Sequence, residues 1–322
     1  MSHYCEPEKR PITKLSVVAI TMATIALTHL YLRSIELPGI SERMSLQAEI
    51  LAGTAESPYR YRLLIPFAAE GLRRSFNNFV GDQLAFVLAF VLLNFATISY
   101  YLYRLLILLQ RWLPESTALT GSLLVAIAMP VTFQDHVYQP WSFLEAGLFC
   151  HACSATLDRR FRTILALTFA STLNRETGLF VAAVWAASTY SLQPKHQDIS
   201  NARSVIPLVI WAGTYGVLRY LLGHADHVHG IRDLWALNTQ PRDLIFSIVN
   251  LAVLLGPLWA FIPSGAREAP PDFRRLLLII PVYTIFYVVF GRWPEVRILL
   301  TPLPLMIGAA LLSLNPRDSS WR

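Results

Sequence analysis

The apolar run 163–192 carries a polar and charged group near its middle, Asn174-Arg175-Glu176-Thr177-Gly178. Thirty residues of α-helix would be about 45 Å long against a hydrocarbon core of about 30 Å, too long for one upright crossing and too short for two. A charge inside a bilayer is costly unless it pairs or faces a water-filled cavity. We therefore expect a broken or re-entrant helix with a functional site at the break. The alternative is one strongly tilted helix that ends in a local Arg175–Glu176 ion pair.

Composition places the whole chain in a membrane. Hydrophobic residues make up 54% and charged residues 15% of the 322 residues, and the mean hydropathy is +0.44. These values predict an all-α polytopic membrane bundle, a single integral membrane domain over residues 1–322 that leaves no length for a soluble catalytic domain. The Lys and Arg residues behind the net charge of +6 lie in short groups between apolar runs. They indicate membrane topology and not nucleic-acid binding.

We expect about nine or ten membrane segments, one of them the broken or re-entrant helix. The other expected segments are the apolar runs 15–32, 83–109, 117–133, 143–157, 204–222, 244–262, 276–290 and 298–314. Lys9, Arg10 and Lys14 place the N-terminus in the cytoplasm, so the polar stretch 33–82 faces outward. Within that stretch, residues 60–74 mix apolar and basic residues like an amphipathic helix at the membrane surface.

In the topology with a re-entrant break, the polar groups that could form a site fall on one external side. Arginine suits an anionic phosphate because its guanidinium donates two parallel hydrogen bonds and keeps its charge near lipid. The candidate substrate-binding residues are Arg60, Arg62, Asn174, Arg175, Glu176, Arg292, Glu295 and Arg297. Two alternatives stay open: loop 292–297 is only a rigid, ion-paired cap, and the first-loop arginines, Arg73 and Arg74 above all, contact lipid headgroups.

Carboxylates on the same side could deprotonate a hydroxyl or bind a divalent cation. The candidate catalytic acids are Glu36, Glu42, Glu49 and Asp135. Glu145 lies inside an apolar run and is expected to line the cavity or to pair with an arginine.

Two motifs could bind a metal. Cys150-His151-Ala152-Cys153 lies in an apolar run, where small residues usually serve helix packing. His224-Ala225-Asp226-His227-Val228-His229 offers imidazole and carboxylate ligands but lacks the i, i+4 histidine pair of zinc hydrolases, and a polar or pH-sensitive loop is the alternative. We assign no metal site and no certain cofactor, and a divalent cation stays open.

The chain resembles the GT-C class of polytopic glycosyltransferases, which use lipid-phosphate-linked sugars, and small bacterial inner-membrane proteins of that type. The resemblance rests on the acidic first loop, segment 57–66 (Ser-Pro-Tyr-Arg-Tyr-Arg-Leu-Leu-Ile-Pro), segment 174–178 and segment 292–297 (Arg-Trp-Pro-Glu-Val-Arg). It implies Glu36, Glu42 or Glu49 as a base or metal ligand. It also implies Arg175, Arg292 or Arg297 as holders of the donor's phosphate. The first loop departs from the class because it has no Asp-x-Asp or Asp-Glu pair.

The function implied is transfer of a sugar from a polyprenyl-phosphate donor to an acceptor glycan, lipid or protein. The reaction is expected on the periplasmic face of a bacterial inner membrane, with membrane lipid as a further partner. Two alternatives stay open: a transporter or flippase for an anionic or lipid-linked solute, and a non-catalytic membrane scaffold. The sequence contains no phosphate-binding Gly-rich loop, nucleophile elbow or dinucleotide fingerprint.

Overall fold

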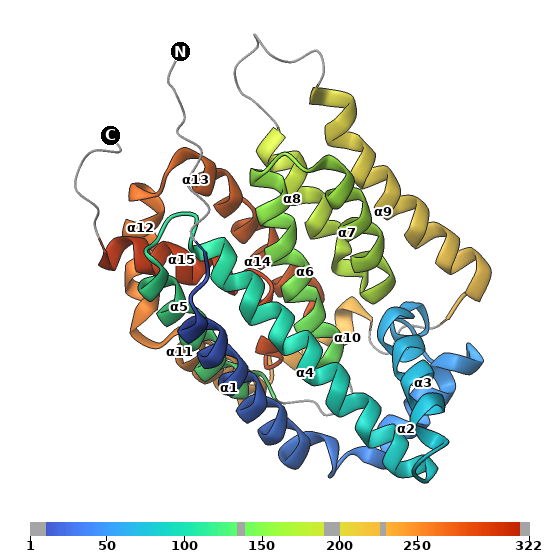
Figure 1. Cartoon of the computed structure of the whole chain (residues 1–322). Coiled ribbons are helices and arrows are strands. Elements are labelled where there is room, and N and C mark those ends of the chain that lie inside the picture. The colour runs from blue at the N-terminus through green and yellow to red at the C-terminus, as the bar shows by residue number, and fades with distance from the viewer. Residues whose placement is uncertain (1–10, 134–138, 190–199, 226–229, 316–322) are drawn as a thin grey trace.

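The computed structural model describes residues 11–133, 139–189, 200–225 and 230–315. In these ranges the chain is helical and forms no β-strand (Figure 1). The α-helices are α1 (Lys14–Tyr31), α2 (Ile40–Ala52), α3 (Leu64–Asn77), α4 (Asp82–Leu109), α5 (Glu115–Ala128), α6 (Gln139–Leu157), α7 (Phe161–Asn174), α8 (Leu179–Thr189), α9 (Ser200–Leu222), α10 (Ile231–Asn238), α11 (Pro241–Leu255), α12 (Ile262–Glu268), α13 (Pro271–Leu277), α14 (Ile279–Phe290) and α15 (Leu303–Leu314). Short 3₁₀ turns and one π-helical turn, Leu32–Glu36, join or extend them.

Six helical segments of the described chain are long and apolar enough to cross a membrane. They are Lys14–Glu36, Asp82–Leu109, Glu115–Thr132, Arg203–Leu222, Pro241–Glu268 and Pro271–Phe290, and Glu176–Ser188 and Leu303–Leu314 are shorter apolar helices. Their outer faces carry exposed apolar side chains, such as Val209, Ile245 and Ile285, as expected of surfaces in contact with lipid. The chain is therefore an integral membrane protein, and the predicted all-α polytopic bundle is confirmed.

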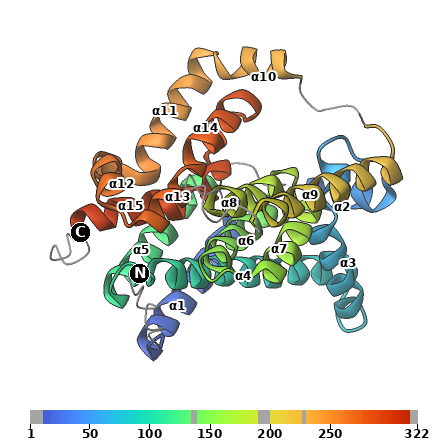
Figure 2. The ribbon, with the colours of Figure 1, turned by 90° about the horizontal axis from the view of Figure 1, so that it is seen from above.

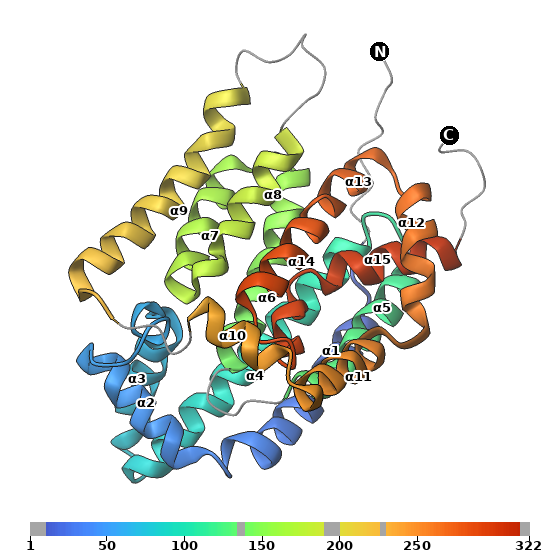
Figure 3. The same ribbon diagram turned by 180° about the vertical axis from the view of Figure 1, so that it is seen from behind.

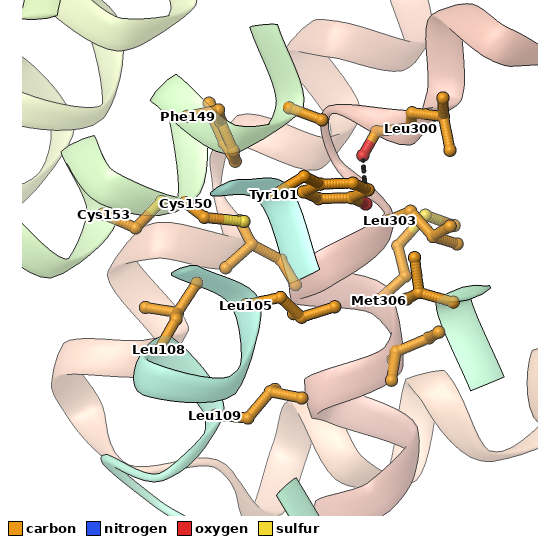
Figure 4. Packing of buried hydrophobic residues seen from close by; sticks show 14 of the residues in the cluster. Tyr101, Leu105, Leu108, Leu109, Phe149, Cys150, Cys153, Leu300, Leu303 and Met306 are labelled. Atoms are coloured by element: carbon orange, nitrogen blue, oxygen red, sulfur yellow. Dashed lines mark hydrogen bonds between the residues drawn. The ribbon is translucent and has the colours of Figure 1, made fainter. Parts of the chain in front are cut away.

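The core lies where α4 packs along α6, with α15 against the same region. Tyr101 of α4 is fully buried and donates a hydrogen bond to the carbonyl of Leu300, 2.9 Å away (Figure 4). Cys150 and Cys153 lie fully buried beside it as free thiols (Figure 4). A Cβ on Gly147 would come within 2.5 Å of the Tyr100 ring, so α4 and α6 approach closely. The two cysteines thus occupy a tightly packed helix contact, in agreement with the packing interpretation.

The described part of segment 163–192, which ends at residue 189, folds as a hairpin: α7 and α8 run antiparallel on either side of a 3₁₀ turn at Glu176–Gly178 (Figure 1). At 1.5 Å per residue α7 is about 21 Å long and α8 about 16 Å, so neither spans a 30 Å hydrocarbon core. A Cβ on Gly178 would lie 2.6 Å from the backbone nitrogen of Thr172, so the turn requires glycine. The broken, re-entrant helix is confirmed, and the single tilted helix is wrong.

Both ends of the hairpin meet the start of α9. The Trp185 indole donates to the carbonyl of Arg203 at 2.9 Å, and the Arg203 guanidinium lies 6.0 Å from the centre of the Phe161 ring. The tip of the hairpin instead faces the first loop, where the Leu63 nitrogen donates to the Leu173 carbonyl at 2.9 Å. The α2–α3 region packs at this end of the bundle, where α1 ends and α4 begins (Figures 1 and 3).

Three details of the polar segments differ from expectation. The amphipathic helix begins at Leu64 and not at residue 60, because segment 55–63 is held by side-chain hydrogen bonds to the end of α9. Helices α2 and α10 arise in segments predicted as loops. Seen from above, α10, α11 and α14 form a curved wing that stands apart from α7 and α9 (Figure 2).

Candidate functional site

Arg62 brings the first loop to the tip of the hairpin. Its Nη2 lies 2.7 Å from Oε1 of Glu176 and its Nε lies 3.3 Å from Oε2, a two-point contact across 114 residues of sequence. The Arg62 side chain is 7% exposed and that of Glu176 is 31% exposed. The arginine is therefore buried, while part of its carboxylate partner remains accessible.

Arg175 points its charge to α6 and not to its neighbour Glu176. Its Nη1 lies 2.9 Å from Oε2 of Glu145 and 3.2 Å from the Ser142 hydroxyl. Thr177 donates a short hydrogen bond to the other oxygen of Glu145. The side chains of Arg175 and Glu145 are 9% and 3% exposed, so the pair is buried. Glu145 pairs with an arginine, which was one of its two predicted roles.

Loop 292–297 is held between α10, α11 and α14. The Asn238 amide donates to the Gly291 carbonyl and accepts from the Trp293 nitrogen, both at 2.9 Å. Within the loop, Arg297 donates to Glu295 at 2.6 Å, which is one of the two ion pairs that the alternative of a rigid cap requires. Burial raises the pKa of Glu295, but the guanidinium of Arg297 and the more distant Arg292 and Arg175 hold the pKa, on balance, below its ordinary value.

Glu36 forms a fourth charged group, fully buried, with Arg43 and Tyr31. Its carboxylate lies 3.2 Å from Nη1 of Arg43, with side chains only 0% and 3% exposed. Arg43 also donates to the Tyr31 hydroxyl at 2.7 Å and lies over the Phe90 ring at 4.8 Å. Glu36 ends a π-helical turn, a local irregularity that is frequent at functional sites.

These pairs form one connected set, which we call the polar cluster: Tyr31, Glu36, Arg43, Arg62, Glu145, Arg175, Glu176, Glu295 and Arg297. Arg175 lies within electrostatic range of Glu176 and Glu295 as well as of Glu145. Arg297 in turn lies within electrostatic range of Tyr31, which belongs to the Glu36 group, and so links the hairpin to Glu36. The cluster therefore includes residues of the first loop, the hairpin tip and loop 292–297.

Several buried polar atoms in the cluster and at the neighbouring Asn174 have no hydrogen-bond partner among the described residues. They are both carboxylate oxygens of Glu36, Nε of Arg175 and Oδ1 of Asn174, whose amide nitrogen donates to the Trp141 carbonyl at 2.9 Å. Native proteins satisfy nearly all buried polar groups, so such atoms mark places where a ligand or water completes the site.

A ladder of aromatic and arginine side chains holds the first loop against α9. Trp211 and Tyr215 stack at 5.5 Å, and the Arg219 guanidinium lies between the rings of Tyr215 and Tyr61 at 4.6 and 4.7 Å. The Trp211 indole donates to the backbone carbonyl of Glu176 at 3.0 Å. The ladder thus fixes both sides of the Arg62–Glu176 pair. Sequence reasoning missed it, although residues 211, 215 and 219 have the i, i+4 spacing of one helix face.

The remaining candidates lie outside the cluster. Arg60 donates to the carbonyls of Ala55 and His224 at 2.9 and 3.0 Å, so it ties loops together. Arg292 is 41% exposed and 3.7 Å from Asp243. Glu42 and Glu49 are exposed on α2. Arg73 and Arg74 both pair with Glu70. Asp135 and the histidine run beyond residue 225 lie outside the described residues.

The structure brings no metal-ligand set together in the part of the chain that it describes: no group of three or more His, Cys, Asp or Glu side chains there is arranged to hold an ion. His151 of the Cys-His-Ala-Cys motif instead shares a 2.8 Å hydrogen bond with the Tyr100 hydroxyl.

Comparisons of the chain with protein-family models, with curated proteins and with solved structures find no match. The function must therefore be inferred from the polar cluster itself.

Proposed function

We propose that the chain is a glycosyltransferase that moves a sugar from a polyprenyl-phosphate donor to a hydroxyl of an acceptor glycan, lipid or protein. The observation that carries the proposal is Glu36. It is a buried first-loop carboxylate that forms an ion pair with Arg43 but accepts no hydrogen bond from the described residues, and it belongs to the same cluster as Arg175 and Arg297. Transfer of a sugar from a phosphate leaving group requires a base and cationic groups in one site.

In the proposed reaction Glu36 accepts the proton of the acceptor hydroxyl. The hydroxyl oxygen then bonds to the anomeric carbon as the bond from that carbon to the phosphate oxygen breaks. Arg175 and Arg297 stabilise the charge that develops on the departing phosphate. A single displacement of this kind inverts the anomeric configuration.

The site belongs, in this proposal, to the periplasmic face of a bacterial inner membrane. The basic residues Lys9, Arg10 and Lys14 precede the first span and favour a cytoplasmic N-terminus. The first loop, the hairpin tip and loop 292–297 then share the opposite side, where lipid-linked sugars and acceptor hydroxyls meet.

The test uses the full-length protein in lipid nanodiscs with a panel of polyprenyl-phosphate-linked sugars. We expect release of polyprenyl phosphate by the wild type from at least one donor, and a loss of about 10²-fold or more in Arg175→Gln, because a charge-stabilising group is removed. Arg242→Gln, an exposed arginine outside the cluster, is the matched control and keeps the wild-type rate. Equal rates in Arg175→Gln and the wild type, with both proteins folded, would refute the role of the cluster.

The re-entrant hairpin favours one second candidate, a transporter of an anionic or lipid-linked solute. Neither α7 nor α8 spans the membrane and their polar junction is buried, as at the binding sites of transporters with broken helices. In the same nanodiscs, transport predicts that lipid phosphate binds in an Arg175-dependent manner and that no donor is cleaved.

A further inference from the structure

Helices α10 and α14 enclose a hollow that the polar cluster does not use. Its volume is about 320 Å³, and it is lined by Ile231, Arg232, Trp235, Ala236 and Val289. The two helices lie side by side at the end of the curved wing (Figure 3). The C-terminal end of α10 is fixed to the protein through the buried Asn238, whose amide donates to the Gly291 carbonyl. The hollow is therefore an open, apolar surface beside an anchored helix, and Arg232 is the one charged residue among those that line it.

Among the residues that the structure describes, Arg232 has no ion-pair partner. No acidic residue of the described chain lies within ion-pair distance of it. Its neighbour Asp233 is engaged elsewhere, because its Oδ2 accepts from the Gly230 nitrogen at 3.0 Å and caps α10. Asp243 is paired with Arg292. An anion bound at Arg232 would therefore meet an unneutralised guanidinium.

The hollow lies next to the ends of two candidate membrane spans. Helix α10 directly precedes the span Pro241–Glu268, and α14 ends the span Pro271–Phe290. Trp235 is 51% exposed and packs edge-to-face on Trp293, 5.5 Å away. Tryptophan is enriched at the membrane interface because its ring is apolar and its N–H is polar. The apolar side of the hollow thus faces acyl chains, and Arg232 lies near the phosphates.

We propose that this hollow binds an anionic phospholipid, with its phosphate on Arg232 and one acyl chain along Ile231, Trp235 and Val289. Since a methylene group occupies about the volume of a water molecule, roughly 30 Å³, 320 Å³ holds about ten methylenes. That is a segment of a single acyl chain. The site is separate from the sugar transfer proposed above and does not depend on it.

The test is photo-crosslinking in nanodiscs that contain the full-length protein and either phosphatidylglycerol or phosphatidylcholine, each with a diazirine on the acyl chain. We expect phosphatidylglycerol to label peptides that contain residues 231–236 or 289. Arg232→Gln lowers this labelling about fivefold, the effect of one basic residue near an anionic surface, and leaves labelling by phosphatidylcholine unchanged. Ala236→Trp fills the hollow and lowers labelling by both lipids.

Matched controls are Arg242→Gln, which removes a neighbouring exposed charge, and Ala212→Trp, which adds a ring to the exposed face of α9. Neither changes labelling at the hollow. Equal labelling by the two lipids in the wild type, or labelling by phosphatidylglycerol that survives both Arg232→Gln and Ala236→Trp, would overturn the proposal. Displacement of the phosphatidylglycerol label by an equimolar polyprenyl phosphate would also overturn it, because the hollow would then prefer a different lipid.

Discussion

At the scale of single residues, two charged side chains at the hairpin tip are adjacent in sequence but pair with partners on different elements. Arg175 pairs with Glu145 of α6, whereas Glu176 pairs with Arg62 of the first loop. An ion pair between neighbours would satisfy two charges without any tertiary contact. The crossed pairing instead joins three segments at the tip of the hairpin. The charges that cost most to bury thus also fix the geometry of the site.

The buried Arg175–Glu145 pair makes a prediction about stability. Removing one partner leaves an uncompensated buried charge, so Arg175→Gln and Glu145→Gln should each lower the free energy of unfolding by about 3–5 kcal/mol. The double variant should lose less than the sum of the two single changes, because no lone charge remains. Unfolding in mixed micelles measures all three, and strictly additive losses would show that the two side chains are not coupled.

The lowered pKa of Glu295 makes a prediction about pH. Because the folded-state pKa lies below the ordinary value of 4.5, Glu295 stabilises the fold fully above that pH, and its contribution is lost as the pH falls through the lowered value. The difference in thermal stability between wild type and Glu295→Gln should be largest near neutral pH and shrink below about pH 4.5. A difference that stays constant down to pH 3 contradicts the assignment.

At the scale of elements, the tight turn of the hairpin depends on Gly178. An alanine there would press its Cβ against the backbone of Ser171 and Thr172, which cannot move as a flexible side chain can. We expect Gly178→Ala to cost about 1–3 kcal/mol of stability and to lower any activity of the cluster. Gly213→Ala on α9, where a Cβ meets nothing within 4 Å, is the matched control and should be neutral or mildly stabilising. Equal effects of the two changes would mean that the turn is not as tight as described.

At the scale of the whole molecule, the hairpin sets the sidedness of the chain downstream of it. A re-entrant segment keeps Arg160 and Arg203 on one side of the membrane, whereas a single crossing would separate them. In a background with Cys5, Cys150 and Cys153 replaced, Arg160→Cys and Arg203→Cys should react with an impermeant maleimide from the same side. Glu56→Cys should react from the other side. Labelling of Arg160→Cys and Arg203→Cys from opposite sides would exclude the hairpin in the membrane.

The long helices could be predicted from the sequence, but the ion-pair partners of the buried charges could not. An apolar run that is long enough to cross a membrane predicts the position of a helix directly. The run 83–109 corresponds to the helix Asp82–Leu109. Helix α10 was missed because eight residues at an interface give little periodic signal. The partners of Arg62 and Arg175 lie 114 and 30 residues away, and only the folded bundle decides which acid each arginine meets. Arg43 was not singled out because its role depends entirely on the burial of Glu36.

In the proposed reaction the polar cluster uses Glu36 as the base of the transfer. The most direct measurement compares polyprenyl phosphate release by Glu36→Gln and by Glu42→Gln, an exposed glutamate of the same loop, on a donor that the wild type cleaves. We expect Glu36→Gln to lose about 10²–10⁴-fold in rate, the usual contribution of a general base, and Glu42→Gln to keep the wild-type rate. A folded Glu36→Gln protein that turns over as fast as the wild type would contradict the account.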